Sequence, residues 1–590
     1  MTDAIEIPRP EHPRPQFYRP DWVNLNGEWS FTLDGGRSGH ERGFAESNGF
    51  DGSILVPFCP ESELSGVGHR DFIECMWYQR PIEIPGDWAG RRVLLHFGAV
   101  DFLSEVYVDG ELVGRHWGGS ASFAHDLTRF VRPGRTHNLV VRVIDETRSG
   151  RQPGGKQCHA YASRGCHYTR TTGIWQTAWL EAACPVGLRD CHILPDLDGG
   201  RFVLVPSYHA AAAGLTLRAT LTEGEQVVAA AEVAAAGGAS CVLPIEAPKA
   251  WSPETPFLYG LKLEVVDADG QAVDAVRSYA GLRKVHVEGN GVFLNNEPFY
   301  LRLVLDQGFY PEGIWTAPTD EALRGDIELS QRAGFNGARL HQKVFEERFH
   351  YWADQLGYLT WGESASWGMA MWRDEADRSN AAASGWNFLG EWREIVTRDR
   401  NHPSIIAWSP FNETRGGAGR PLHRRLHEDA YELTRALDPT RPVNDSSGYV
   451  HARTDLWTVH NYEQDPARLK RKLTPTEEAG VFRNVPDHDA PYEGQPYIVD
   501  EFGGIKWVPP GRRPFSEISW GYGEGPETLE EFYERLEGLV AVLDGMEHIC
   551  GWCYTQLTDV EQEQNGIYNY DRTEKFDMAR IRRALTGETG

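Results

Sequence analysis

The chain has 590 residues, with 85 Asp or Glu against 59 Lys or Arg, so its formal net charge is −26 at pH 7. That length suffices for three or four domains with sizeable cores. The negative charge excludes a typical nucleic-acid surface, which needs concentrated Lys and Arg, and no run approaches the roughly 18 apolar residues of a membrane span. Because the N-terminal residues lack the basic and apolar regions of a secretion signal, we expect a cytoplasmic protein.

The first third of the chain is predicted to be β-structure. Segments such as 27–35 (GEWSFTLDG) and 138–145 (NLVVRVID) alternate apolar and polar residues between Gly and Asp turns. This pattern favours a β-sandwich of the jelly-roll type over residues 1–183. Residues 146–173 interrupt it with a polar loop rich in Gly and Arg, and loops of that length are usually functional or disordered.

Two further domains follow. Residues 184–285 contain short strands and repeated turns over about a hundred residues, which suits an immunoglobulin-like sandwich. From 286 to 590, apolar runs such as 405–413 (IIAWSPFNE) alternate with helical stretches such as 320–333. Repeated β–α units of this kind predict a (β/α)₈ TIM barrel, whose active site lies at the carboxyl ends of its strands. A multidomain chain of jelly roll, immunoglobulin-like sandwich and TIM barrel is therefore expected.

The nine Cys residues are expected to be free thiols, since their number is odd and no secretion signal precedes them. Two clusters leave alternatives open. Cys158 and Cys166, each followed by His, could form a zinc site, although the spacing fits no usual finger. Cys550 and Cys553 have redox-motif spacing within a strand-like run rather than at a helix N-terminus. For both, buried structural cysteines are the preferred interpretation.

Polar residues gather at the predicted strand ends of the barrel. Two apolar runs end in glutamates, Glu413 and Glu501. Two carboxyl groups at one barrel mouth can cleave an acetal, because one can protonate the leaving oxygen while the other stabilises the oxocarbenium-like transition state. In this scheme Arg339 would keep one carboxylate ionised, and Asn412 would bind the sugar 2-hydroxyl. The aromatic Trp552 would be the platform under the sugar ring, with core packing as the alternative.

These segments resemble a known family. Residues 398–413 (RDRNHPSIIAWSPFNE) look like the acid/base signature of glycoside hydrolase family 2, which contains β-galactosidases, β-glucuronidases and β-mannosidases. Residues 107–128 resemble its sugar-binding jelly roll, and residues 251–265 resemble its immunoglobulin-like domain. Residues 497–504 (YIVDEFGG) and 551–572 (GWCYTQLTDVEQEQNGIYNYDR) resemble its barrel. The motifs cover nearly the whole chain in the family's order.

The resemblance implies roles for individual residues. Glu413 would be the acid/base and Glu501 the nucleophile, oriented and charge-stabilised by Arg339 and Tyr462. The subsite of the non-reducing sugar would be lined by His341, Asp306 and Trp552. The family retains anomeric configuration, so a carboxyl separation of about 5–5.5 Å is predicted rather than about 6.5–9.5 Å.

Departures from the family pattern narrow the expectation. The Asn-x-Lys pair that glucuronidases use for the uronate is not evident near Asn565, and Glu363 lacks the nearby His of a magnesium site. We therefore predict no metal and no other cofactor.

Three loop tryptophans, Trp315, Trp367 and Trp386, are candidate platforms for the leaving group. The 146–173 loop, with Lys156 and Gln157, is a candidate to reach over the barrel mouth.

The resulting prediction is an exo-acting, retaining β-glycosidase that removes terminal sugars from small carbohydrates or glycosides, with β-galactoside-type substrates first. A galactofuranosidase, arabinopyranosidase or uronidase of the same family is the alternative within the class. A non-catalytic carbohydrate-binding protein and a zinc- or thiol-dependent hydrolase are the alternatives outside it. No nucleic-acid or membrane partner is expected, and a homo-oligomeric state is left open.

Overall fold

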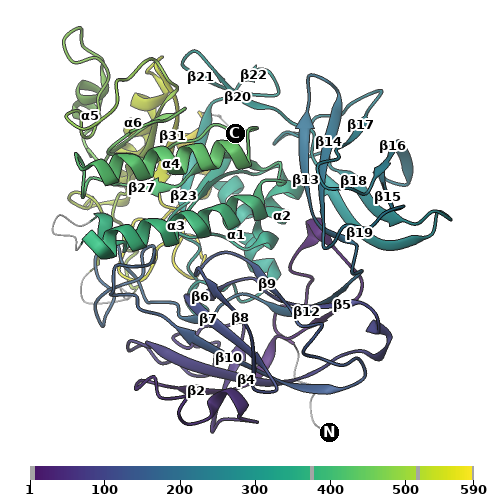
Figure 1. Ribbon diagram of the computed structural model, residues 1–590. Helices are drawn as coiled ribbons and strands as arrows, with labels where there is room; N and C mark the ends of the chain where they lie inside the picture. Colours follow the sequence, from purple (N-terminus) through teal and green to yellow (C-terminus); the bar gives the residue numbers. More distant parts are fainter. Residues whose placement is uncertain (1–6, 373–377, 513–518, 588–590) are drawn as a thin grey trace.

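The computed structural model describes residues 7–372, 378–512 and 519–587 (Figure 1). The N-terminal sandwich packs two antiparallel sheets around a core that includes Trp29, Tyr78 and Leu95. The larger sheet has the strand order β3 (Gly52–Val56), β2 (Gly27–Leu33), β4 (Cys75–Glu83), β10 (Thr136–Ile144), β7 (Leu103–Val108) and β8 (Glu111–Trp117). The smaller sheet has the order β1 (Trp22–Asn24), β12 (Ala178–Ala183), β5 (Arg92–Phe97) and β9 (Phe123–Asp126). A short pair, β6 (Val100–Asp101) and β11 (Gly173–Ile174), lies beside them.

The second sandwich is immunoglobulin-like. Its sheets are β13 (Leu188–Asp196), β14 (Arg201–Tyr208) and β17 (Cys241–Pro244), and β16 (Gln226–Ala234), β15 (Thr216–Glu223), β18 (Tyr259–Val266) and β19 (Ala272–Ala280). Strand β18 shows why this sequence is a strand: Leu261 and Leu263 are buried, while Lys262 between them is exposed. A small sheet of β20 (Val285–Glu288), β21 (Gly291–Leu294) and β22 (Glu297–Pro298) leads into the third domain.

The third domain is a TIM barrel. Seven of its strands form one parallel sheet in the order β26 (Ile405–Ser409), β25 (Leu359–Glu363), β24 (Gly337–Leu340), β23 (Leu301–Asp306), β31 (Ile549–Thr555), β30 (Tyr497–Gly503) and β29 (Trp457–Asn461). The remaining position is filled by β28 (Ser446–Ser447), which pairs in parallel with β27 (Phe411–Asn412). Every residue of β30 is buried, as expected for a parallel strand covered on both faces.

Helices surround the barrel strands. They are α1 (Asp320–Ala333), α2 (Glu347–Leu356), α3 (Arg378–Asp399), α4 (Pro421–Leu437), α5 (Pro466–Leu473), α6 (Leu529–Asp544) and α7 (Met578–Thr586). Local sequence sets their ends. The Thr319 side chain caps α1 by accepting a hydrogen bond from the Ala322 N–H, and Gly334, with φ of 108°, ends that helix. Within the ranges that the structure describes, four short 3₁₀ helices are also present: η1 (Pro15–Phe17), η2 (Phe44–Glu46), η3 (Gly86–Trp88) and η4 (Ala370–Trp372).

The first sandwich lies against the barrel, and the immunoglobulin-like domain lies to one side (Figure 1). Two hydrogen bonds illustrate these contacts. The Ser120 N–H donates to Glu391 of α3, and the Ile193 N–H donates to the Asn401 side chain.

Most tryptophans fill cores: those with almost no exposed surface are Trp29, Trp77, Trp175, Trp179, Trp251, Trp315, Trp361, Trp392, Trp408, Trp457 and Trp552. Within the described ranges, no helix has both the length and the apolar character required to cross a bilayer.

Candidate active site

The two glutamates singled out from the sequence meet at the carboxyl ends of the barrel strands. Glu501 lies in β30, and Glu413 directly follows β27. One carboxylate oxygen from each, together with a ring nitrogen of His460, lie within 4.8 Å of one another. The structure therefore places the two carboxyl groups close enough to act on opposite sides of the same atom of a bound molecule.

Glu501 is held by three donors. Arg339 forms an ion pair with its Oε1, the Tyr462 hydroxyl donates to Oε2 at 2.5 Å, and His460 Nδ1 lies 3.2 Å from Oε2. Its side chain is only 4% exposed. Three donors fix the orientation of this carboxylate, and a preorganised carboxylate suits a nucleophile.

Glu413 has a different environment. Its side chain is 22% exposed, and its one ion-pair partner among the described residues is His460, with Nδ1 2.8 Å from Oε1. The backbone at Glu413 has a φ of 52°, an uncommon value for a non-glycine residue. The N–H of Glu413 donates to the Ser447 carbonyl oxygen, which holds this turn at the barrel mouth. A carboxyl group with solvent access on this side suits proton exchange.

His460 was not among the site residues predicted from the sequence, yet it connects the two carboxyl groups. Its Nε2 lies 3.4 Å from Asp500 Oδ1, while its Nδ1 faces Glu413 and Glu501. Burial alone would lower the pKa of His460, but the charges of Glu501 and Asp500 raise it to about 10. The ring is therefore an imidazolium at neutral pH. The feature of the sequence that could have identified His460 as a site residue is its position at the end of the apolar run that forms β29.

Arg339 also organises the residues beneath the two glutamates. Its Nη1 lies 2.5 Å from Glu363 Oε2 and 3.3 Å from Asn412 Oδ1. Burial raises the pKa of Glu363 to about 7, against the lowering effect of the Arg339 charge. The Asn412 side-chain Nδ2 is buried and has no hydrogen-bond partner within the described part of the chain. That free donor beside Glu413 is available for a sugar hydroxyl.

His341 lies at the base of this cluster. Its Nδ1 is 3.0 Å from Glu363 Oε1, and the side chain is buried. Burial lowers the pKa of His341 well below its usual value, helped by the charges of Lys156 and Arg339. A neutral, hydrogen-bonded His fits a bracing role, and its contact with substrate stays a prediction.

One predicted substrate residue, Trp552, was wrong. Side chains alternate along β31, so Cys553 faces the barrel interior while Trp552 packs in the helix-side core. The Trp552 indole N–H donates to Asp544 of α6 at 2.8 Å. The residue of this strand that reaches the site is Thr555, whose hydroxyl lies 3.1 Å from the Tyr462 hydroxyl. The strand runs three residues further than the position chosen from the sequence.

Asp306 is at its expected strand end but outside the network of Glu413 and Glu501. Its Oδ1 accepts the Gly308 N–H at 2.9 Å. Burial raises the pKa of Asp306 to about 7, and the charge of Asp326 in α1 adds to this effect. Binding of a sugar hydroxyl by Asp306 therefore stays a prediction.

The loop tryptophans separate into three situations. Trp315 is 1% exposed and packs against Trp175, so it is not a platform. Trp386 is 77% exposed on α3. Trp367 lies at the site, because its indole N–H donates to the Asn412 carbonyl oxygen at 3.0 Å and its ring lies near His341. Of the three, Trp367 is the one positioned beside Asn412 and Glu413.

The polar loop 146–173 of the first sandwich reaches the barrel. The N–H groups of Gly154 and Gly155 donate to the carbonyl oxygens of Trp367 and Ala365, at 2.8 and 3.0 Å. Gly155 has a φ of 57°, and a Cβ there would lie 2.3 Å from the Gln342 carbonyl oxygen. Glycine is thus required for the loop to approach the strand ends this closely.

The far end of the loop is attached to the segment after β31. The Tyr168 hydroxyl donates to Glu563 and accepts a hydrogen bond from Gln307 at 2.8 Å. The Gln562 side chain donates to the carbonyl oxygens of Gly165 and His167. Contacts at both ends therefore hold residues 154–169 against the segments that follow the barrel strands.

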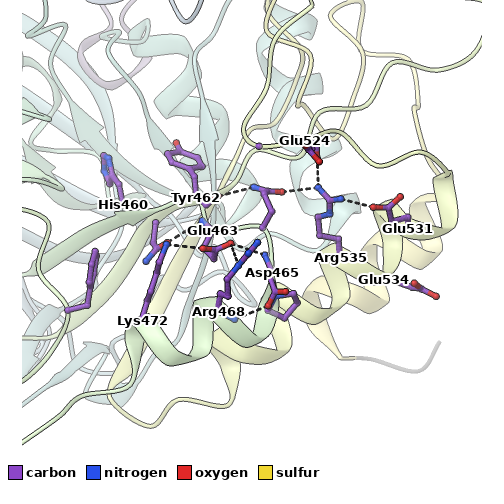
Figure 2. Close-up of a pocket in the computed structure, with 15 residues that line it drawn as sticks. His460, Tyr462, Glu463, Asp465, Arg468, Lys472, Glu524, Glu531, Glu534 and Arg535 are labelled. Carbon is purple, nitrogen blue, oxygen red and sulfur yellow. Dashed lines mark hydrogen bonds and ion pairs between the residues drawn. The ribbon is translucent and has the colours of Figure 1, made fainter.

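A pocket of about 830 Å³ adjoins the site at the end of β29 (Figure 2). His460, Asn461 and Tyr462 line it, together with residues 463–465, 482 and 523–524 and side chains of α5 and α6. The cations there are already paired: Glu463 binds both Arg468 and Lys472, and Arg535 binds Glu531. This pocket consequently offers no uncommitted cation among its described residues.

Metal and thiol chemistry find little support in the geometry. Among described residues, the group with three candidate metal ligands close together is Glu413, His460 and Glu501. As an imidazolium, His460 carries a proton on each ring nitrogen and offers no lone pair to a metal ion. All nine Cys residues are free thiols. Burial raises the pKa of Cys550 to about 12 and that of Cys553 further, so neither is a thiolate at neutral pH.

A TIM-barrel mouth with one carboxylate clamped by Arg339 and Tyr462, and a second carboxyl group facing it, defines a glycoside hydrolase. Comparison with known proteins agrees with this class. The chain belongs to glycosyl hydrolase family 2. The family's TIM barrel domain matches residues 285–507, its central domain matches 206–283, and its sugar binding domain matches 67–151.

Named relatives show what the chain is similar to. It is 25% identical to a beta-glucuronidase from Paenibacillus borealis, over 96% of this chain and 97% of that protein. It is 24% identical to a beta-galactosidase from Thermoanaerobacter pseudethanolicus, over 82% of this chain and 61% of that protein. A solved structure of the β-glucuronidase from Ruminococcus gnavus has a TM-score of 0.79 and 19% identity, covering 96% of this chain and 98% of that one. Because its identity to the Ruminococcus gnavus protein is low, this last comparison supports the fold of the chain alone.

Proposed function

We propose that this protein is an exo-acting, retaining β-glycosidase in which Glu413 is the acid/base and Glu501 is the nucleophile. The observation that carries the proposal is the short distance between the two carboxyl groups, with one oxygen of each within 4.8 Å. Retaining enzymes need about 5–5.5 Å between carboxyl groups, whereas inverting enzymes need about 6.5–9.5 Å to fit a water molecule.

The two environments fit two steps. In the first, Glu413 gives its proton to the glycosidic oxygen while Glu501 attacks the anomeric carbon, so the leaving alcohol departs and a glycosyl ester forms. In the second, Glu413 takes a proton from water, the water oxygen attacks the anomeric carbon, and Glu501 leaves as a carboxylate. Arg339 and Tyr462 hold Glu501 in place through both steps.

For the terminal sugar, a β-galactoside-type substrate is the first candidate, consistent with relatives named beta-galactosidase. A uronide is the second, consistent with relatives named beta-glucuronidase and with a cation, Lys156, beside the site. Galactofuranosides and arabinopyranosides remain alternatives. The cytoplasmic location and a homo-oligomeric state stay predictions.

The test is hydrolysis of a panel of 4-nitrophenyl glycosides: galactopyranoside, galactofuranoside, arabinopyranoside, glucuronide, galacturonide and mannoside. Replacing Glu501→Gln or Glu413→Gln should lower kcat by roughly 10³-fold or more on any substrate that is cleaved. Glu530→Gln, on the exposed side of α6, is the matched control and should leave kcat unchanged. Cleavage of none of these glycosides would favour a non-catalytic carbohydrate-binding protein.

The same assay excludes or supports the other rival. A zinc- or thiol-dependent hydrolase would lose activity with a chelator or an alkylating agent. The two-glutamate mechanism predicts that both treatments leave kcat/KM within about twofold, because that mechanism uses neither a thiol nor a metal ion.

A further inference from the structure

Lys156 is carried to the active site by the loop of the first sandwich. The residue is 5% exposed, although it belongs to a long polar loop. The two glycines before it are anchored to the barrel through Trp367 and Ala365. Its own carbonyl oxygen accepts the Tyr168 N–H at 2.8 Å. The backbone that carries Lys156 is therefore fixed from both sides of the barrel mouth, which preorganises its side chain.

The ammonium of Lys156 lies between two aromatic rings rather than beside a carboxylate. Its Nζ is 5.5 Å from the Trp367 ring centroid and 5.9 Å from the Tyr168 ring centroid. Within the part of the chain that the structure describes, no Asp or Glu oxygen lies within ion-pair distance of this nitrogen. Ring faces attract a cation but accept none of its three N–H groups as a carboxylate would.

The acidic group that its charge affects is already satisfied by other donors. Glu563 accepts hydrogen bonds from the Tyr168 hydroxyl and from Asn565. Burial raises the pKa of Glu563, against the opposing charge of Lys156. The neighbouring His341 is kept neutral, as described above. Among the described residues, Lys156 thus forms no ion pair although its side chain is largely buried, so a bound ligand that supplies the counter-charge would stabilise it.

Lys156 is connected to the region of Glu413 through Trp367. The Trp367 ring under the Lys156 ammonium is the one whose indole N–H binds the Asn412 carbonyl oxygen, one residue before Glu413. Trp367 thus links the two residues: its ring contacts the Lys156 ammonium, and its indole N–H binds the backbone next to Glu413.

We propose that Lys156, held between Trp367 and Tyr168, is an anion-binding subsite that takes an acidic group of the substrate. This inference rests on the proposed function and sharpens it: the substrate carries a carboxylate, either on the terminal sugar as a uronide or on the leaving group. An ammonium–carboxylate contact is a charge-assisted hydrogen bond, which discriminates an acid from its neutral counterpart.

Matched pairs of substrates test the assignment. The first pairs are 4-nitrophenyl β-galacturonide with the galactoside, and the glucuronide with the glucoside. A third pair keeps a galactosyl group and compares a 4-hydroxybenzoate leaving group with 4-nitrophenol. Lys156→Met should lower kcat/KM for the acidic member roughly 10- to 100-fold more than for the neutral member in one of these pairs. The pair that responds shows whether the acid lies on the sugar or on the leaving group.

Two further variants and a binding assay serve as controls. Lys156→Arg should restore most of the preference for the acidic substrate, and Lys470→Met, on the exposed face of α5, should change nothing. Equal losses on both members of every pair, or no loss, would overturn the assignment. If the wild-type protein cleaves no glycoside, the proposed function fails. Calorimetry with D-galacturonate and D-glucuronate then decides the subsite: binding that Lys156→Met abolishes supports it, and absence of binding refutes it.

Discussion

Replacing His460→Asn removes the positive charge that faces the carboxyl groups of Glu413 and Glu501 while leaving an N–H donor near the position of Nδ1. In the native protein that nitrogen lies 2.8 Å from Glu413 and 3.2 Å from Glu501, and Nε2 lies 3.4 Å from Asp500. The pKa of His460 rises from 6.5 to about 10 on folding. At about 1.4 kcal/mol per pKa unit, the charged ring stabilises the folded protein by on the order of 5 kcal/mol.

The pH dependence of this stabilisation has a definite sign. Because the pKa is raised in the folded state, the contribution is fully present below pH 6.5 and is lost as the pH rises towards about 10. Thermal unfolding of the wild type and of His460→Asn, followed by circular dichroism between pH 6 and pH 10, measures it. The difference in Tm should be largest at pH 6 and should shrink steadily to a small value at pH 10. A difference that stays constant over this range would refute an imidazolium at position 460.

Three other substitutions test separate parts of the site. Tyr462→Phe removes a hydroxyl that donates to Glu501, so kcat should fall by roughly 10- to 100-fold with little change in Tm. Trp552→Phe should lower Tm by a few degrees through its lost hydrogen bond yet keep kcat/KM within about threefold, and a larger kinetic loss would return it to the active site. Gly155→Ala should displace the loop and lower kcat/KM at least about tenfold, whereas Gly154→Ala, whose Cβ meets nothing within 4 Å, is the matched control. Equal kinetics for these two alanine variants would contradict the loop's role.

The sequence was informative wherever one strand or one motif carried the answer. The alternation of apolar runs and helices predicted the barrel, and the position of a carboxylate after a buried strand singled out Glu413 and Glu501. Arg339 and Tyr462 were likewise assigned, and both contact Glu501 in the structure. The barrel and the two glutamates needed only the rule that parallel strands end at a common edge, whereas the role of Tyr462 came from the resemblance to glycoside hydrolase family 2.

The rest depended on geometry that a strand end alone does not fix. Trp552 was assigned to the site in error. Side chains alternate between the two faces of a strand, and β31 continues to Thr555, so the sequence alone did not show which residue of this strand lies at the barrel mouth. His460 was overlooked as a partner because its importance comes from Asp500 and Glu413 on other strands. The 146–173 loop crosses between domains, so no local pattern could show which barrel residues it contacts.

The central claim is that Glu501 forms a covalent glycosyl intermediate while Glu413 exchanges the proton. Trapping with a 2-deoxy-2-fluoro glycosyl fluoride of the sugar that the panel identifies tests it most directly, read by mass spectrometry of the digested protein. We predict one added glycosyl group on the peptide that carries Glu501, and no label in Glu501→Gln. A label on another residue, or rapid turnover of the cleaved substrate without any label, would contradict the account.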